Sequence, residues 1–402
     1  MPHAPEVNGR QVFTGLRVVD LSRWVAGEYA TKLFADFGAD VVKVEKPGSG
    51  SRSRHWALVP GEQPDPEANP LFLHLNTNKR SIAVDLHSAE GVELVKRLIA
   101  RSDAVIESFR PGHLERLGLG PDVLRESNPR LVVTRISPFG QSGPYRDREA
   151  TGIVLQAAGG PMNATGDAHR APQRKPGLLE QYTIGRTAGE ATLAGLYHAR
   201  RTGTGSTIDV SGQEVLLSSA DRRASYLVTA AYSGVNAPRG VRSAHRGQST
   251  FTGPFRAADG FVMIYITNQE FWNRLIRLIG ADDEAFRAKF LDRPQLGDDW
   301  PAFMSYLKAW FAARPKIQIM EAAEAARIPC TAYLQMDELY DHPHFRGRGA
   351  FVTADHPVAG RLDYFGAPWR MRDGFQLRRT APRLGEHTAE VTAELEMSVV
   401  RP

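Results

Sequence analysis

Near the start of the chain, the pattern of hydrophobic and polar residues changes from that of a strand to that of a helix and back to that of a strand. Apolar runs at 18–21 and 41–44 predict two strands, and apolar residues at three- and four-residue spacing over 29–37 predict a helix between them. We expect Gly27 to form the tight turn before this helix and Gly38 to end it. A strand–helix–strand unit of this kind belongs to a parallel sheet that binds ligands at its strand ends.

The same alternation continues to about residue 215. It predicts further strands at 81–86, 104–107 and 131–136, and helices at 88–101, 121–128 and 178–200. Ser88 is a suitable cap for the helix that starts there. Repeated strand–helix units place this part of the chain in the Rossmann-like, doubly wound α/β class.

Small residues recur at three- and four-residue spacing along the predicted helix at 178–200. They are Gly185, Ala188, Gly189, Thr192 and Gly195. This stripe lets another backbone come close and predicts a tightly packed helix.

A second domain is expected from about Gly234, because 402 residues exceed one small core. The segment 234–253 is rich in Gly, Arg, Ser and Pro and is typical of a linker. Beyond it the pattern predicts a strand at 261–266 and helices at 271–280, 300–313 and 317–327.

The charge balance favours a small anionic ligand. The net charge of +5 is spread along the chain without a long basic run, which argues against a nucleic-acid partner. No G-x-G-x-x-G motif follows the first strand, so nothing indicates NAD or FAD. Lys43 and Lys46 instead suggest a phosphorylated ligand held beside the second strand.

The lone cysteine and the absence of targeting signals predict a cytoplasmic protein. Cys330 cannot form an internal disulfide and is expected to be buried rather than nucleophilic. The first eleven residues lack the features of a signal peptide, and no apolar stretch reaches the ~18 residues of a membrane span. The histidines show no metal-ligand spacing, so no metal site is expected.

Several motifs then occur in order along nearly the whole chain. They are VDLS (19–22) with AG (26–27), ADFGADVVKVE (35–45), NTNKRSI (76–82), IESFRPG (106–112), LERLG (114–118), SPFGQSGPY (137–145), RTGTG (201–205), HP (356–357) and LGEHT (384–388). Together they resemble the class III CoA-transferases, the family that includes formyl-CoA transferase, carnitine CoA-transferase and the α-methylacyl-CoA racemases.

The resemblance implies an organisation and a set of partners. It implies a large CoA-binding α/β domain at 1–225, a linker and small α+β domain at 226–345, and a return to the large domain at 346–402. It also implies a homodimer of two interlocked rings. The expected substrates are coenzyme A as an acyl-CoA thioester and a small carboxylic acid, with no permanently bound cofactor.

The resemblance also implies which residues hold coenzyme A. By motif match these are Trp24, Val25, Lys46, Ser108, Phe109 and Arg116. Cations suit the phosphates of the ligand and apolar side chains suit its adenine and arm. Arg110 offers one more charge on the same segment, and Lys79 with Arg80 offers another anion contact or a loop anchor. The alternative is that the arginines are solvated surface charges and that Trp24 belongs to the core.

The chain departs from its relatives at the nucleophile. The family's transferases use an aspartate four residues before a glycine, and counting back from Gly185 gives Gln181. An amide cannot form the mixed anhydride that a carboxylate forms. Glu180 is the adjacent residue, but one residue of offset turns a helical side chain by about 100°. Either Glu180 replaces the aspartate, or covalent transfer is lost; an exposed first-turn glutamate is the structural alternative.

Three functions therefore remain open. The first is CoA transfer from an acyl-CoA donor to a carboxylic acid acceptor, with Glu180 and Gln181 at the reacting carbonyl. The second is an inactive paralogue that binds CoA esters. The third is a non-covalent acyl-CoA isomerase or lyase, in which Gln181 donates a hydrogen bond to the thioester oxygen. Proton exchange by a histidine–aspartate pair is not expected, because no histidine occurs in 146–152.

His245 lies in the predicted linker with Gly240 and Gly247. It is interpreted as part of a plain linker or of a lid over the site.

Overall fold

The computed structural model describes residues 11–57, 61, 63–166, 169–218, 228, 230–234, 251–293 and 296–397. The chain divides into two compact units, one formed by 1–239 with 347–402 and the other by 240–346. Most of the predicted linker at 234–253, His245 included, lies outside the described residues. Each unit is therefore described by itself.

The first unit is built on a six-stranded parallel sheet with the order β3-β2-β1-β4-β5-β6. Its strands are β1 (Arg17–Leu21), β2 (Asp40–Glu45), β3 (Lys79–Ala83), β4 (Ala104–Glu107), β5 (Val132–Ser137) and β6 (Thr207–Ser211). Beyond β1 the strand order reverses and continues with β4, which makes their carboxyl ends a topological switch point. The doubly wound α/β class is confirmed.

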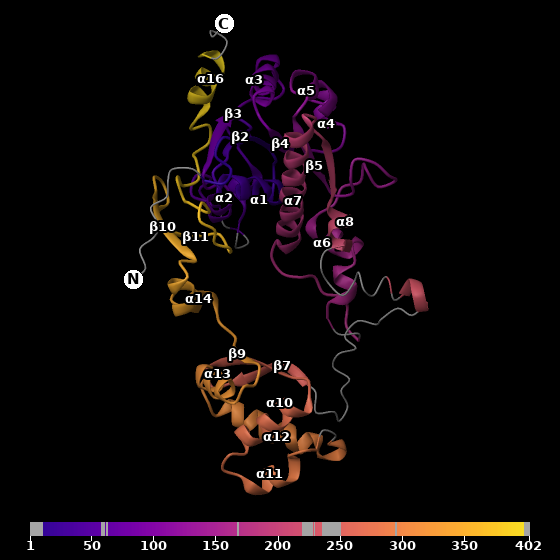
Figure 1. Cartoon of the computed structure of the whole chain (residues 1–402), viewed down its shortest axis with the longest axis vertical. Helices are drawn as coiled ribbons and strands as arrows, with labels where there is room; N and C mark the ends of the chain where they lie inside the picture. The colour runs from indigo at the N-terminus through magenta and orange to yellow at the C-terminus, as the bar shows by residue number, and fades with distance from the viewer. Residues whose placement is uncertain are drawn as a thin grey trace. The chain divides into compact units, whose positions relative to one another are not determined.

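Helices cover both faces of this sheet. They are α1 (Val25–Ala35), α2 (Pro70–Leu75), α3 (Ala89–Ala100), α4 (His113–Arg116), α5 (Pro121–Ser127), α6 (Gly152–Ala158), α7 (Leu179–Thr202), α8 (Gly212–Ser218) and α16 (Thr388–Met397), with 3₁₀ turns η1 (Arg52–His55) and η2 (Pro161–Ala164). A hairpin of β10 (Phe351–His356) and β11 (Gly360–Phe365) precedes α16, which lies beside β3 and α3 (Figure 1).

The alternation of side chains along the strands explains this double cover. In β1, Val18 joins the cluster under α1 and α7, while Val19 joins the cluster under α3, α5 and α16. Because both faces of the sheet are covered, apolar residues of one strand can pack into cores on either side of it, as parallel sheets require.

Most predicted elements occur close to their expected bounds, and Ser88 caps α3 by accepting the amide of Gly91 at 3.0 Å. The prediction for Gly27 was wrong: it lies inside α1, not in a turn before it. A Cβ there would stand 2.1 Å from Cβ of Ser22, so glycine lets the helix fold back on the end of β1. Gly38 does follow α1, with φ of +107°.

The small-residue stripe of α7 forms a close helix–helix contact, as predicted. A Cβ on Gly185 would stand 2.4 Å from the carbonyl oxygen of Ala26 in α1, and one on Gly195 would stand 2.9 Å from Val132 of the sheet. Gly185 thus fixes how α7 lies along α1. One turn before it, the Tyr182 ring packs edge-on against Tyr29 at 4.9 Å, and burial raises the pKa of Tyr182 to about 12.

A fully buried group of charges joins β1, β2, β3 and α1. Asp20 accepts hydrogen bonds from Lys79 Nζ at 3.1 Å and from Thr31 Oγ1 at 2.7 Å, and it ion-pairs with Lys43 Nζ at 3.6 Å. Lys43 also pairs with Glu28 at 3.1 Å. The expectation that Lys43 holds a phosphorylated ligand was therefore wrong, because the side chain has no access to solvent.

Compensation within this group sets the ionisation of Asp20. Burial alone would raise the pKa of Asp20, but Lys43, Lys79 and two hydroxyl groups lower it to about 2. The interpretation of Lys79 as a loop anchor is confirmed, because its ammonium also donates to the carbonyl of Glu28 at 2.8 Å and to Asn76 Oδ1 at 2.9 Å.

The second unit is a smaller α+β assembly. An antiparallel sheet of order β7-β8-β9 carries alternating buried positions in β8, where Val262, Ile264 and Ile266 face an aromatic core around Trp272 and Phe303. Its elements are β7 (Phe251–Ala257), β8 (Gly260–Ile266), α10 (Gln269–Ile279), α11 (Glu284–Phe290), η4 (Gly297–Asp299), α12 (Trp300–Ala312), α13 (Lys316–Ala325), β9 (Cys330–Ala332), α14 (Met336–Tyr340) and α15 (Pro343–Gly347).

Cys330 is half-buried in β9, and burial raises the pKa of its thiol to about 11. This agrees with the interpretation that it is not a nucleophile. Within the described ranges, no helix combines the length and apolar character needed to cross a membrane.

We expect Gly185→Ala to destabilise the first unit by about 1–3 kcal/mol, because the new methyl group meets backbone rather than a flexible side chain. Chemical denaturation should show a lower midpoint. Gly347→Ala is the matched control, since a Cβ there meets nothing within 4 Å. Equal midpoints for the two variants would contradict the close contact.

We expect Asp20→Asn to cost about 3–5 kcal/mol, because it leaves the buried ammonium of Lys79 without its carboxylate partner and removes one of the two carboxylates that pair with Lys43. The pKa of Asp20 is about 2 in the folded chain and 3.8 ordinarily. Its stabilising effect is therefore present above about pH 4 and is lost as the pH falls toward 2.

Denaturation measured across this pH range should show a shallower acid limb for Asp20→Asn than for the unmodified chain. The exposed pair of Asp122 with Arg125 supplies the control, and Asp122→Asn should change stability by less than about 0.5 kcal/mol. A parallel loss in both variants would rule out the buried group as the cause.

Candidate active site

A hollow of about 130 Å³ opens at the carboxyl ends of β1 to β4, across the switch point. We call it the switch-point hollow. Its walls come from 21–23 after β1, 44–46 with Gly50 and Ser51 after β2, 84–87 after β3, and Phe109 with His113 after β4. In doubly wound sheets this edge is where ligands bind.

The segment between β1 and α1 forms one wall. The backbone amide of Arg23 donates to Ser108 Oγ at 3.0 Å, which ties the end of β1 to the end of β4 across the switch point. Trp24 is half-buried, with its ring 5.2 Å from that of Trp56 and the Arg52 guanidinium 5.1 Å from its centroid. Val25 is fully buried at the start of α1.

The segment after β4 supplies an aromatic and a cationic group. The amide of Phe109 donates to Glu107 Oε2 at 2.6 Å, and its ring packs against His113 at 4.8 Å. Arg116 is exposed and contacts His113 Nδ1 at 3.3 Å. Burial and the charge of Arg116 lower the pKa of His113, so the neutral ring is favoured beside the hollow.

Glu107 itself is held below the hollow. Burial raises the pKa of its carboxyl group to about 7, while hydrogen bonds from Arg135 Nε at 2.8 Å and from the Phe109 amide oppose the rise. The carboxylate therefore fixes the turn after β4 rather than facing the ligand.

The loop after β2 is anchored from beneath. Glu45 accepts from Arg54 Nε at 2.8 Å and from the amide of Ser51 at 2.9 Å, and the Ser51 hydroxyl also donates to buried Glu28. Lys46 stays exposed on the rim of the hollow. The anchored loop thus presents the exposed ammonium of Lys46 at the opening.

Glu180 and Gln181 begin α7 but point to different neighbours. Glu180 is only 5% exposed, and its carboxylate accepts a hydrogen bond from Gln156 Nε2 at 3.0 Å. Its Oε1 lies so close to Gly152 that a Cβ added to this glycine would be 2.0 Å away. Its carboxylate therefore faces α6. It is not the exposed first-turn glutamate of the structural alternative.

Gln181 lies about 100° further round the helix than Glu180. It precedes Gly185 by four residues, so it shares the face of α7 that contacts Ala26 in the first turn of α1. It is half-buried. Position 181 is thus on the side of α7 toward the start of α1, the helix that follows the 21–23 segment of the hollow.

The structure therefore gathers several predicted site residues at one edge of the sheet. Lys46 and Phe109 line the hollow, Ser108 is bonded to its wall, and Arg116 contacts His113. Arg110 instead pairs with Glu149 on the surface, and Lys79 is buried elsewhere.

The sequence analysis did not single out His87, His113 or Ser51. All three follow strand ends in the predicted sheet, and that position alone could have marked them. Among the described residues, no group of three or more His, Cys, Asp or Glu side chains could hold a metal ion.

Comparison with known proteins shows the family of the chain. The model of CoA-transferase family III matches residues 13–388. The chain belongs to this family. The family III match spans residues of both units.

Similar proteins cover almost the whole chain. An acyl-CoA transferase of Fusarium pseudograminearum is 32% identical over 96% of this chain and 85% of its own length. A formyl-CoA:oxalate CoA-transferase of Streptomyces avermitilis is 32% identical over 94% of this chain and 93% of its own. The crystal structure of a CAIB/BAIF family protein from Brucella suis aligns with a TM-score of 0.81 and 28% identity, covering 96% of this chain and all of that one.

Proposed function

We propose that this family III protein transfers coenzyme A from an acyl-CoA to a carboxylic acid. The observation that carries the proposal is the switch-point hollow, which combines an apolar ring, a rim cation and strand-end loops in a chain that matches the family over 13–388. The formyl-CoA:oxalate CoA-transferase that it resembles names a donor and an acceptor of this chemical class.

Coenzyme A is proposed to bind through its phosphates and its adenine. Lys46 on the rim and Arg116 beyond His113 supply cations on two segments about the opening. Phe109 and Trp24 supply apolar surface for the base and the pantetheine arm. Ser108, Val25 and the amide of Arg23 shape the turn between these groups.

The reacting carbonyl is proposed to lie beside Gln181 rather than Glu180. Gln181 shares the α7 face that meets the first turn of α1, whereas the carboxylate of Glu180 is buried against Gln156. The Gln181 amide N–H can donate to the thioester oxygen as negative charge develops there. The interpretation that Glu180 replaces the missing aspartate is therefore not favoured.

Transfer without an enzyme nucleophile requires both substrates to be bound together. An oxygen of the acceptor carboxylate bonds to the thioester carbonyl carbon, the C–S bond breaks, and coenzyme A leaves as the thiolate. The thiolate then attacks the acceptor carbonyl of the resulting anhydride, and the donor acid leaves as its carboxylate. Holding the two reactants in place supplies much of the rate, and Gln181 stabilises each oxyanion.

The predicted interlocked homodimer stays part of this proposal. Light scattering of the purified chain should give twice the monomer mass of 44.3 kDa.

We expect Lys46→Gln and Arg116→Gln each to weaken coenzyme A binding about tenfold, or ~1.4 kcal/mol, because each removes a charge-assisted phosphate contact. Isothermal titration calorimetry measures this directly. Arg130→Gln removes an exposed charge at the opposite edge of the sheet and should leave the affinity unchanged. Equal weakening in all three would indicate a general charge effect instead of these contacts.

We expect no covalent CoA adduct on the unmodified chain during turnover, because position 181 is an amide and Glu180 is enclosed. Intact-mass spectrometry after mixing with an acyl-CoA and a dicarboxylic acid tests this. In Gln181→Asp the carboxylate should form a thioester adduct with the mass of coenzyme A less one water, whereas Glu180→Asp should not.

Other outcomes separate the alternatives. An adduct on Glu180 would overturn the assignment of Gln181. Binding with no product under any acceptor favours an inactive CoA-ester-binding paralogue, and conversion of an acyl-CoA without an acceptor favours an isomerase or lyase.

A further inference from the structure

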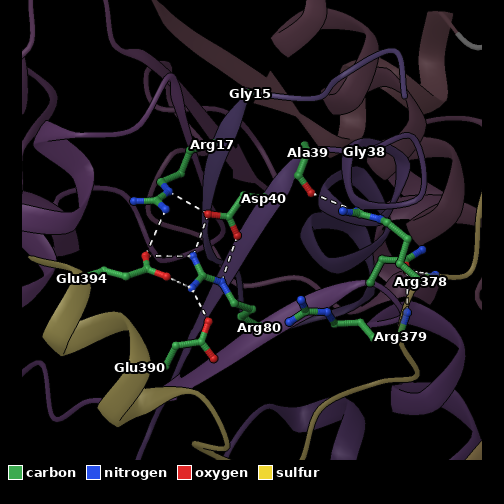
Figure 2. Close-up of a pocket in the computed structure, with 11 residues that line it drawn as sticks. Gly15, Arg17, Gly38, Ala39, Asp40, Arg80, Arg378, Arg379, Glu390 and Glu394 are labelled. Atoms are coloured by element: carbon green, nitrogen blue, oxygen red, sulfur yellow. Dashed lines mark hydrogen bonds and ion pairs between the residues drawn. The ribbon is translucent and has the colours of Figure 1, made fainter. Parts of the chain in front are cut away.

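A second pocket, of about 320 Å³, lies at the amino ends of β1, β2 and β3 (Figure 2). We call it the amino-edge pocket. Since the strands are parallel, this is the edge of the sheet opposite the switch-point hollow. Its charged lining consists of Arg17, Asp40, Arg80, Arg378, Arg379, Glu390 and Glu394.

Two of the four arginines are neutralised by the three carboxylates. Arg17 pairs with Asp40 at 2.8 Å and with Glu394 at 3.1 Å. Arg80 pairs with Asp40 at 2.6 Å, with Glu390 at 2.9 Å and with Glu394 at 2.6 Å. These pairs form a closed network on one side of the pocket (Figure 2).

The other two arginines have no carboxylate partner within the part of the chain that the structure describes. Arg378 Nη2 donates to the carbonyl oxygens of Ala35 at 2.7 Å and Ala39 at 3.2 Å. Arg379 Nη1 contacts His387 Nε2 at 3.3 Å. Figure 2 shows Arg378 reaching toward Ala39 and Arg379 extending toward Arg80.

Their remaining N–H groups are thus open to a ligand. Burial and the charge of Arg379 lower the pKa of Arg378, while the carboxylates of Asp36 and Asp40 oppose the shift.

Asn78 holds these two residues in place. Its Oδ1 accepts the backbone amides of Arg378 at 2.7 Å and Arg379 at 3.1 Å, and its Nδ2 donates to Asp36 at 2.8 Å. The residue itself has φ of +63°, a conformation that non-glycine residues adopt at a cost. The segment that carries both guanidinium groups is therefore fixed before any ligand arrives.

We propose that the amino-edge pocket binds a small dianionic oxyanion, either phosphate or a short dicarboxylate, between Arg378 and Arg379. The four arginines and three carboxylates of the lining leave it with a net charge of +1, and the two guanidinium groups without a carboxylate partner form its anion-binding side. Guanidinium groups bind such oxygens through paired N–H donors. This site is separate from the coenzyme A site and does not depend on the function proposed above.

Titration calorimetry with inorganic phosphate and, separately, with malonate tests the proposal on the full chain. We expect saturable binding of one anion per chain, weakened at least tenfold in Arg379→Gln and in Arg378→Gln. Because Arg378 also bonds to carbonyls at the end of α1, Arg379→Gln is the decisive variant. The preferred anion of the two identifies whether the ligand is tetrahedral or a dicarboxylate.

Two comparisons exclude binding elsewhere. Arg277→Gln removes an exposed charge in the second unit and should leave the affinity unchanged. Saturating coenzyme A should not displace the anion. Absence of saturable binding, equal binding in Arg379→Gln, or loss of binding in Arg116→Gln would overturn the proposal, and none of these results bears on CoA transfer.

Discussion

The carboxylate of Asp20 is the interaction on which the first unit depends. It lies at the end of β1 and joins Lys43 of β2, Lys79 at the start of β3 and Thr31 of α1, all without access to water. Removing one member of such a group leaves an uncompensated buried charge, so the stabilising effect of each member depends on the presence of the others. Asp20 also accepts the amide of Ser22 at 2.9 Å, which sets the turn leading into α1.

This group reaches the candidate site through the loop after β2. Lys43 pairs with Glu28, whose carboxylate accepts the hydroxyl of Ser51, and Ser51 lines the switch-point hollow. The neighbouring pair of Glu45 with Arg54 holds the same loop from the other side. These buried ion pairs hold the loop in place from beneath, and Lys46 is exposed as a result.

Hydrophobic spacing predicted most of the sheet and its helices, because the residues of a strand or helix that pack into the core are mainly apolar and recur at a regular spacing in the sequence. It could not predict the role of Lys43, since a lysine in a strand is ordinarily solvated and its partners lie 15 and 23 residues earlier in the chain. Gly27 was misplaced for a related reason: glycine there permits contact with Ser22, a requirement that only the folded packing reveals.

The residues of the candidate site were predicted mainly from their positions in the motifs, and less from their charge or hydrophobicity. Strand-end placement accounts for Lys46, Ser108 and Phe109, whereas the difference between Glu180 and Gln181 depends on the rotation of α7. Spacing from Gly185 gave position 181 only as a match to the family motif, and its role stays a prediction. The burial of Glu180 against Gln156 required the structure, because the two residues are 24 positions apart in the chain.

The contact of Gly185 with the Ala26 carbonyl has a wider consequence for how this scaffold can change. Backbone meets backbone there, so the orientation of position 181 is set without help from its own side chain. A replacement at that position alters the side chain while α1 and α7 stay in register. Under the proposed function, one substitution there would therefore change the group that meets the acyl carbonyl without repacking the two helices.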